Sequence, residues 1–217
     1  VLAKQAGLPD GVLNVVTGSA RVVGDELTQS PIVRKLSFTG STEVGKVLLK
    51  QCADTVKKTS MELGGNAPFI VFDDADVDAA IQGALVSKFR NSGQTCVCSN
   101  RLLVQAGVYD EFVEKFSLAV KQFTLGEGTG EGVTQGPLIN RMAVQDVQSM
   151  VNDAVSKGAK VVIGGKSPTL GDRYFEPTIL TQVTTEMRVF QEEIFGPVAP
   201  IKKFVTEEEA VALSNDT

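Results

Sequence analysis

Two short segments carry the side chains best suited to covalent chemistry, a carboxylate and a thiol. Glu62 lies in the segment MELGGNAP at 61–68, and Cys96 ends the segment FRNSGQTC at 89–96. A carboxylate serves as a general base and a thiol as a nucleophile, and covalent catalysis at a carbonyl needs both. Glycines two residues after Glu62 and three residues before Cys96 let the backbone approach a ligand closely. The residue types therefore indicate nucleophilic chemistry rather than simple packing.

A third segment, FTGSTEVG at 38–45, places a glycine turn between a predicted strand and a predicted helix. The N-terminus of a helix after such a turn suits a pyrophosphate. The segment is not a Walker A motif, since no Gly-Lys-Ser/Thr closes it. By itself the pattern fits equally well an ordinary turn in which Ser41 or Thr42 caps the helix.

Strand-like and helix-like segments alternate along the chain, which predicts a doubly wound α/β protein with mostly parallel sheets. We expect loops or turns at 126–136 and 164–172, where glycine is frequent. The predicted strands are 12–16, 35–38, 67–72, 101–104, 160–163 and 199–205. The predicted helices are 22–27, 43–53, 76–89, 108–123, 143–157 and 207–213.

The composition narrows the classes of partner. The 217 residues carry a net charge of −5, which argues against a nucleic-acid partner. No apolar run reaches the length of a membrane span. The three cysteines form no disulfide framework, so a reducing compartment is the simplest interpretation. The absence of histidine removes Cys–His protease chemistry and His-based metal sites, and we expect no metal.

Together, the segments around Glu62 and Cys96 resemble the active-site segments of the aldehyde dehydrogenase superfamily, and they are most similar to the succinate-semialdehyde dehydrogenase branch. The resemblance implies the rear part of a Rossmann-like cofactor domain at 1–64, followed by most of an α/β catalytic domain at 65–217, incomplete at its C-terminus. Because Val1 is neither an initiator Met nor the start of a signal peptide, we expect an internal fragment. The resemblance implies that this fragment is inactive alone, because half of the oxyanion hole and much of the cofactor cleft would lie outside it.

The resemblance also implies catalytic roles. Cys96 would attack the aldehyde to give a thiohemiacetal, and loss of hydride would leave a thioester. Glu62 would deprotonate the water that hydrolyses the thioester, a role that suits a carboxylate with a raised pKa. The backbone N–H of Cys96 would supply half of an oxyanion hole.

NAD or NADP is the implied cofactor. Gly40, Ser41 and Gly45 would bind its diphosphate, with Thr42 at the helix start beside it. In the segment EEIFGP at 192–197, Glu193 would hold the nicotinamide ribose and Phe195 would lie beside the ring. Without the resemblance, this segment is an ordinary charged turn before a strand.

Arg90 and Cys98 refine the prediction. An Arg at a helix end usually faces water or complements the helix dipole. In the resembling branch this Arg binds the distal carboxylate of the substrate, a strong and selective pairing. Cys98 matches a cysteine that in some members forms a reversible disulfide with the nucleophile, here Cys96, and simple packing explains Cys98 equally well. Two further matching segments, QGPLI at 135–139 and FEPT at 175–178, are expected to shape the catalytic domain.

The implied function is NAD(P)-dependent oxidation of succinic semialdehyde to succinate. Glutaric semialdehyde or another ω-carboxy aldehyde would suit Arg90 as well. A non-catalytic structural or binding member of the fold would be expected to lose Cys96 or Glu62, and a thiol hydrolase would leave the nucleotide segment without a role. The resemblance further implies a homo-oligomer, dimeric or tetrameric, located in the cytoplasm, or in the mitochondrial matrix if the source is animal.

Overall fold

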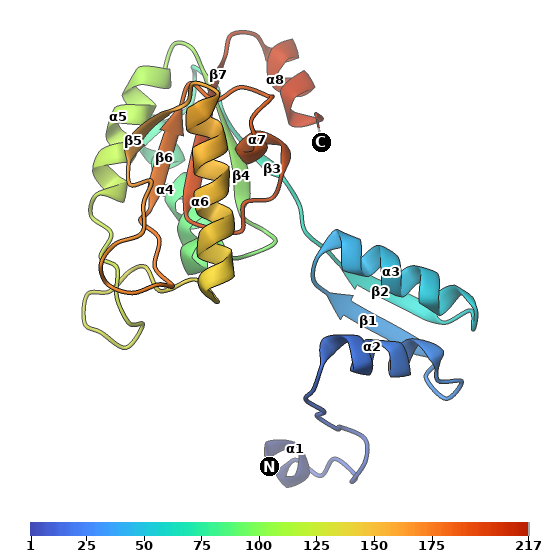
Figure 1. Ribbon diagram of the computed structural model, residues 1–217. Coiled ribbons are helices and arrows are strands. Elements are labelled where there is room, and N and C mark those ends of the chain that lie inside the picture. The colour runs from blue at the N-terminus through green and yellow to red at the C-terminus, as the bar shows by residue number, and fades with distance from the viewer. Residues whose placement is uncertain (217) are drawn as a thin grey trace. The chain divides into compact units, whose positions relative to one another are not determined.

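The computed structural model describes residues 1–216 and divides the chain into two compact units, Val1–Gly64 and Gly65–Thr217 (Figure 1). Each unit has its own sheet and its own core. Within the described residues, no helix has the length and apolar character that crossing a bilayer requires.

The first unit is built on two parallel strands, β1 (Lys35–Thr39) and β2 (Lys58–Glu62). They are joined by α3 (Thr42–Ala53), and α2 (Ala20–Gln29) packs against α3. The unit begins with a short helix, α1 (Leu2–Gln5). Its small core consists of Leu36, Leu48 and Cys52. Because the strands are parallel and in register from Lys35↔Lys58 to Thr39↔Glu62, both carboxyl ends lie at the same edge.

The second unit contains a five-stranded sheet in the order β3-β4-β7-β6-β5. The pairs β3–β4, β4–β7 and β6–β7 are parallel, and only β5–β6 is antiparallel. The strands are β3 (Ala67–Val71), β4 (Ser99–Gln105), β5 (Lys160–Ile163), β6 (Thr178–Thr181) and β7 (Val198–Phe204).

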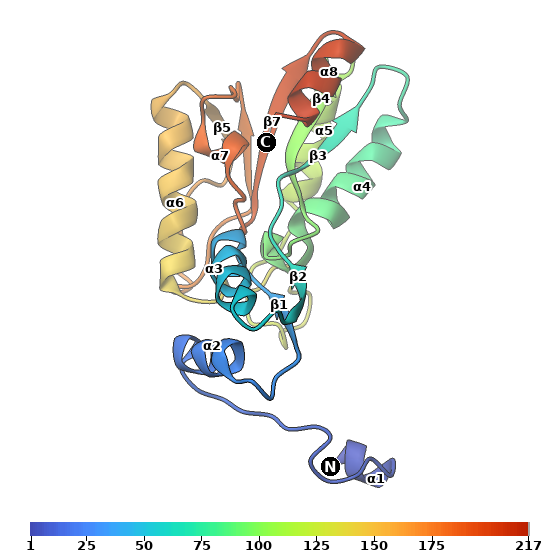
Figure 2. The same ribbon diagram turned by 90° about the vertical axis from the view of Figure 1, so that its right-hand side faces the viewer.

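Helices cover both faces of this sheet, so residues 102–104 of β4 and 198–201 of β7 are buried. Figure 2 shows the strands running between α6 and the pair α4 and α5. One core cluster includes Ile81, Phe112 and Phe116 under α4 and α5, and the other includes Val147 and Val151 under α6. The helices of this unit are α4 (Val77–Phe89), the 3₁₀ turn η1 (Arg90–Gly93), α5 (Tyr109–Val120), α6 (Arg141–Ser156), α7 (Arg188–Gln191) and α8 (Glu207–Ser214).

Side-chain caps mark the starts of α4 and α6. Asp76 accepts the N–H of Ala79 at 3.0 Å at the start of α4, as its position before an apolar helical pattern predicts. Asn140 caps α6 in the same way, and Gly158, with φ of +101°, follows the end of α6.

A buried arginine ties several segments of the second unit together. The Arg101 side chain on β4 is 1% exposed and donates to the carbonyl oxygens of Leu213 at 2.6 Å and Ser214 at 2.9 Å. Its Nε donates to the Asn66 carbonyl at 2.9 Å, and the guanidinium lies over the ring of Phe190, 5.2 Å from the centroid. Carbonyls at the end of α8 thus gain a partner that helix bonding leaves them without.

The predicted α/β class with mainly parallel sheets is confirmed, with differences in detail, among them the short helices α1 and α7, which were not predicted. The predicted strand at 12–16 is wrong, because Val15 and Val16 are 84% and 75% exposed and pair with no described strand. The polar strand β2 and the four-residue strand β6 were not predicted. β2 is mostly polar and β6, with the sequence TILT, has only two apolar residues between threonines, so neither shows a clear apolar period in the sequence.

Candidate active site

Cys96 ends a loop of unusual backbone that directly follows α4. Asn91, Ser92 and Gly93 have φ values of 52°, 55° and 75°, all in the left-handed region that is unfavourable for residues other than glycine. Such a run persists only where surrounding contacts hold it. The Cys96 side chain is exposed at the end of this loop, so its thiol is accessible to a small molecule.

The segment at 135–139 holds this loop in place. The Ser92 hydroxyl donates to the Gly136 carbonyl at 2.9 Å. Gln94 donates to the Pro137 carbonyl at 3.4 Å and accepts the N–H of Ile139 at 2.8 Å. The sequence predicted a general shaping role for this segment. In the structure it directly supports the loop at 90–98, which carries the predicted nucleophile Cys96 and is called the nucleophile loop below.

The segment at 192–197 lies against the same loop. A Cβ added to Gly93 would collide with the backbone of Gly196, so the two segments touch backbone to backbone. Glu193 is half-buried and Phe195 is 45% exposed, with φ of 50°. The structure therefore brings together the loop of Cys96 and the two residues that the sequence assigned to the nicotinamide end of the cofactor.

Cys98 points into the protein, unlike Cys96. Its sulfur lies 2.8 Å from the Thr95 hydroxyl oxygen and donates to the Lys88 carbonyl at 3.7 Å. Lys88 itself is 1% exposed at the end of α4. Burial lowers the pKa of Lys88 to about 8, while the nearby Cys98 and Glu193 oppose that shift. A positive charge is therefore held beneath the nucleophile loop near neutral pH.

Arg90 lies on the same short stretch of chain as Cys96. It follows the last residue of α4, begins η1, and its side chain is exposed. Its guanidinium is thus available to an anion, which a buried structural arginine such as Arg101 is not.

In the first unit, the glycine turn and Glu62 meet at one sheet edge. The N–H of Gly40 donates to the Glu62 carbonyl at 3.0 Å, just beyond the Thr39↔Glu62 pair. The Ser41 hydroxyl accepts the N–H of Val44 at 3.4 Å and caps α3. Gly45 is buried, and a Cβ there would meet the end of the Leu63 side chain at 2.6 Å. The Glu62 side chain is exposed at this edge.

A hollow of about 970 Å³ lies within the first unit, next to this edge. Its lining comes from α2, β1, α3 and the chain before α2, and is mostly apolar. The lining includes Val16, Gly18, Val23, Phe38, Val44 and Val47. Apolar walls beside a capped helix start suit a ligand with a flat ring and an anionic group.

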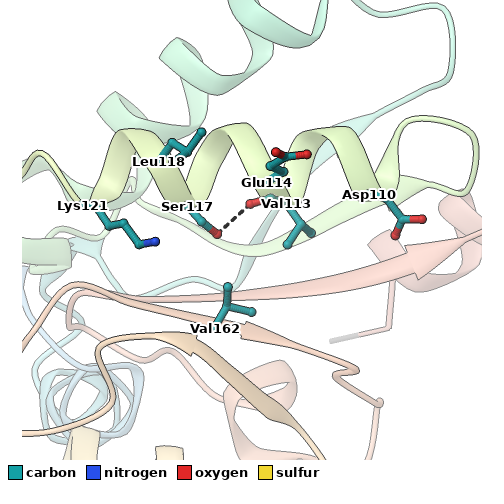
Figure 3. A pocket seen from close by; sticks show the side chains of 7 residues that line it. All are labelled: Asp110, Val113, Glu114, Ser117, Leu118, Lys121 and Val162. Atoms are coloured by element: carbon teal, nitrogen blue, oxygen red, sulfur yellow. Dashed lines mark hydrogen bonds between the residues drawn. The ribbon is translucent and has the colours of Figure 1, made fainter.

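A smaller groove on the second unit has none of these features. It has a volume of about 270 Å³ and lies between α5 and Val162 of β5 (Figure 3). The Ser117 hydroxyl in its wall donates to the Val113 carbonyl of its own helix at 2.6 Å. None of the residues predicted for a site lines it, so we do not assign it a ligand.

No prediction from the sequence covered three polar residues that lie behind the loop at 90–98. Lys88, Asn100 and Asn66 form a connected group behind the nucleophile loop. The sequence could have indicated a buried Lys88, since Lys88 lies on the same helical stripe as Ile81 and Ala84, where an apolar core residue is expected. The two asparagines gave no comparable signal, because their partners lie far away in sequence.

Comparison with known proteins gives consistent matches over the whole chain. The aldehyde dehydrogenase family pattern matches residues 1–217. The chain is 61% identical to glutarate-semialdehyde dehydrogenase of Pseudomonas aeruginosa and 60% identical to mitochondrial succinate-semialdehyde dehydrogenase of Arabidopsis thaliana. Each match covers 100% of this chain but only 45% and 41%, respectively, of the relative. This chain thus spans less than half the length of the curated relatives it matches.

A solved structure matches equally well. The crystal structure of an E. coli NADP-dependent enzyme superposes with a TM-score of 0.98 at 58% identity, over 100% of this chain and 45% of the other.

Proposed function

Because the chain belongs to the aldehyde dehydrogenase family, we propose that the protein containing it oxidises an aldehyde with a distal carboxylate, first of all succinic semialdehyde, to the acid with NAD or NADP. The observation that supports this proposal best is the placement of an exposed Cys96 and an exposed Arg90 on one short, tightly held loop. A nucleophile and an anion-binding group are thereby presented from the same rigid element.

In the proposed reaction, the Cys96 thiolate attacks the aldehyde carbon and forms a C–S bond, while the carbonyl oxygen becomes an oxyanion. The Cys96 N–H donates to that oxygen. When bound, the oxidised nicotinamide supplies the hydride acceptor, and a thioester on Cys96 remains. Glu62 then takes a proton from water, the water attacks the thioester, and the acid and the free thiol are released.

The first unit is proposed to hold the diphosphate and adenosine portions of the cofactor. Gly40, Ser41, Thr42 and Gly45 form the turn and helix start at the carboxyl ends of parallel strands, where ligands of such sheets bind. The neighbouring apolar hollow is wide enough for an adenosine group. Gly45 supports the site indirectly, since it allows α3 to pack closely on Leu63.

Glu193 and Phe195 are proposed to contact the nicotinamide ribose and ring. Their segment lies against the nucleophile loop through Gly196 and Gly93. A hydride acceptor held there would be close to a substrate carbon bonded to Cys96, as hydride transfer requires.

The substrate proposal depends on Arg90. A guanidinium pairs with a carboxylate through two parallel hydrogen bonds, so it favours an aldehyde with a carboxylate at the far end. Succinic and glutaric semialdehydes differ by one methylene, and the relatives that carry these two names are 60% and 61% identical to this chain. Glutaric semialdehyde is therefore the second candidate substrate.

The test compares kcat/KM for succinic semialdehyde, glutaric semialdehyde and butanal in the full-length protein. We expect a preference of about a hundredfold for the better semialdehyde over butanal, equivalent to roughly 2.7 kcal/mol. The Arg90→Gln variant should lose most of this preference and keep its rate with butanal. Arg141→Gln removes an exposed arginine whose Nε lies 3.6 Å from the Asp172 carboxylate, and serves as the matched control. Equal rates with all three aldehydes would remove the substrate proposal.

Cys98 is proposed as a redox partner of Cys96. Peroxide would take two electrons and two protons from the two thiols, forming the S–S bond and two molecules of water. Cys98 would first have to leave its contacts with Thr95 and the Lys88 carbonyl. Mild peroxide should inactivate the full-length protein and dithiothreitol should restore it, whereas Cys98→Ser should abolish the dithiothreitol-reversible part. Activity unchanged by both reagents would leave Cys98 with packing alone.

A further inference from the structure

A buried polar group lies behind the segment that carries Glu193 and Phe195. The Asn100 side chain on β4 is 2% exposed, and Lys88 on α4 is 1% exposed. Asn66, at the start of β3, is half-buried. Burying polar side chains costs free energy unless each finds partners, so their hydrogen bonds indicate what they stabilise.

The Asn100 carboxamide uses both of its ends. Its Nδ2 donates to the Asn66 Oδ1 and to the Glu192 carbonyl, each at 2.7 Å. Its Oδ1 accepts the N–H of Ile194 at 3.2 Å and the ammonium of Lys88 at 3.3 Å. One side chain thus holds the backbone on both sides of Glu193.

Asn66 binds one further backbone group of the same segment. Its Nδ2 donates to the Phe190 carbonyl at 2.8 Å. Because Asn66 Oδ1 is taken by Asn100, the two carboxamides orient one another. Together they bind backbone groups of Phe190, Glu192 and Ile194, which are alternate residues.

The held segment lacks regular secondary structure of its own. Residues 193–195 belong to no helix or strand, and Phe195 has φ of 50°. A backbone of this kind has no ladder of hydrogen bonds to fix its position. Its placement therefore depends on the asparagine side chains and on the close contact of Gly196 with Gly93.

We infer that Asn100 is a positioning residue that, with Asn66, fixes the backbone on either side of Glu193, so that Glu193 and Phe195 are presented to the nicotinamide half of the cofactor. This inference rests on the proposed function. Asn100 touches no reacting atom in the proposed reaction. Asn100 lies four residues after Cys96 in the sequence, and the Glu192 carbonyl that it binds lies 92 residues further along the chain.

The experiment uses the full-length protein and its Asn100→Asp variant. The substitution keeps the shape and the Oδ1 acceptor but removes the donor, leaving the Glu192 carbonyl and Asn66 Oδ1 facing an oxygen. We expect the Kd for NAD or NADP, measured by titration calorimetry, to rise by tenfold or more. The rate of Cys96 alkylation by iodoacetamide without nucleotide should stay within twofold. A purely structural role would not separate these two readouts.

Two further variants complete the test. Asn66→Ala should weaken nucleotide binding by a smaller factor and serves if Asn100→Asp does not fold. Val104→Ala, on the same strand β4, removes buried apolar volume with no polar contact and is the matched control for lost stability. It should leave the nucleotide Kd within twofold.

The outcomes separate the inference from the proposed function. If the unmodified protein binds neither nucleotide, the proposed function is wrong and the inference falls with it. If it binds one of them and the asparagine variants bind as tightly, only the inference is overturned. An equal loss of binding in Val104→Ala would also overturn it, because stability alone would then explain the effect.

Discussion

The nucleophile loop at 90–98 and the glycine turn at 39–45 position functional groups in different ways. The turn is made locally, since a strand ends, Ser41 caps the next helix and Gly45 packs on Leu63. The loop keeps three residues in left-handed backbone through bonds to 135–139, more than 40 residues away. We therefore expect the position of the turn to be insensitive to substitutions elsewhere in the fold. A substitution at 135–139, by contrast, should shift the loop and with it the Cys96 side chain.

The largest expected effect tests whether the loop carries the chemistry at all. In the full-length protein, Cys96→Ser should lower kcat for semialdehyde oxidation by about 10⁴-fold or more, because a hydroxyl is a far weaker nucleophile than a thiolate. Nucleotide binding should persist, since the turn is separate from the loop. Steady-state kinetics and a nucleotide titration would check both parts, and a rate within tenfold of the unmodified protein would remove Cys96 as the nucleophile.

The next effect tests the distant support of the loop. Gly93→Ala would place a Cβ at a φ of 75° and against the Gly196 backbone. We expect a loss of about 3 kcal/mol in the free energy of unfolding, together with a lower kcat. Gly128→Ala meets open space and should change stability by less than about 0.5 kcal/mol. Thermal melts and kinetics of both variants would decide, and equal melting temperatures would show that the loop adapts.

The charge beneath the loop predicts a pH dependence. Burial lowers the pKa of Lys88 from 10.5 to about 8, against the opposing influence of Cys98 and Glu193. Below about pH 8 both the folded and unfolded states hold the proton. Between about 8 and 10.5 the unfolded state binds more protons, so this residue makes unfolding free energy rise with pH, by up to about 1.4 kcal/mol per unit.

Denaturant unfolding of the full-length protein at pH 7.5, 8.5 and 9.5 would measure that rise. Lys88→Met, which removes the titrating group, should show a flatter dependence than the unmodified protein. Identical slopes in the two proteins would contradict the assignment.

The smallest effect tests whether the turn is as self-contained as its bonds indicate. Ser41→Ala removes the cap of α3 and should lower stability by roughly 0.5–1 kcal/mol. Ser41→Gly should lower the free energy of unfolding by only a few tenths of a kcal/mol, because glycine is a tolerated N-cap. If Ser41 also binds the diphosphate, both variants should weaken nucleotide binding alike. Weakening in Ser41→Ala alone would assign the residue to capping only.

Sequence predicted what depends on neighbouring residues. The alternation of elements, the Asp76 cap and the turn at Gly40 all follow from local patterns, and the structure shows each of them. The strand predicted at 12–16 failed because β-branched residues need a packed neighbour to become a strand. The hydrogen bonds from the loop of Cys96 to residues 135–139, and from Asn100 to Glu192, join residues 43 to 92 positions apart. No local periodicity encodes such pairs.

Arg101 has a consequence for synthesis on the ribosome. Its bonds to Leu213 and Ser214 span 112 and 113 residues, so its guanidinium has no such partners until the chain beyond 214 has emerged. In the first unit, by contrast, Lys57 reaches the Ser30 carbonyl only 27 residues back. We therefore expect the first unit to gain protease resistance early in translation and the second only after residue 214 is outside the exit tunnel. Stalled nascent chains of graded length, exposed briefly to protease, would reveal that order.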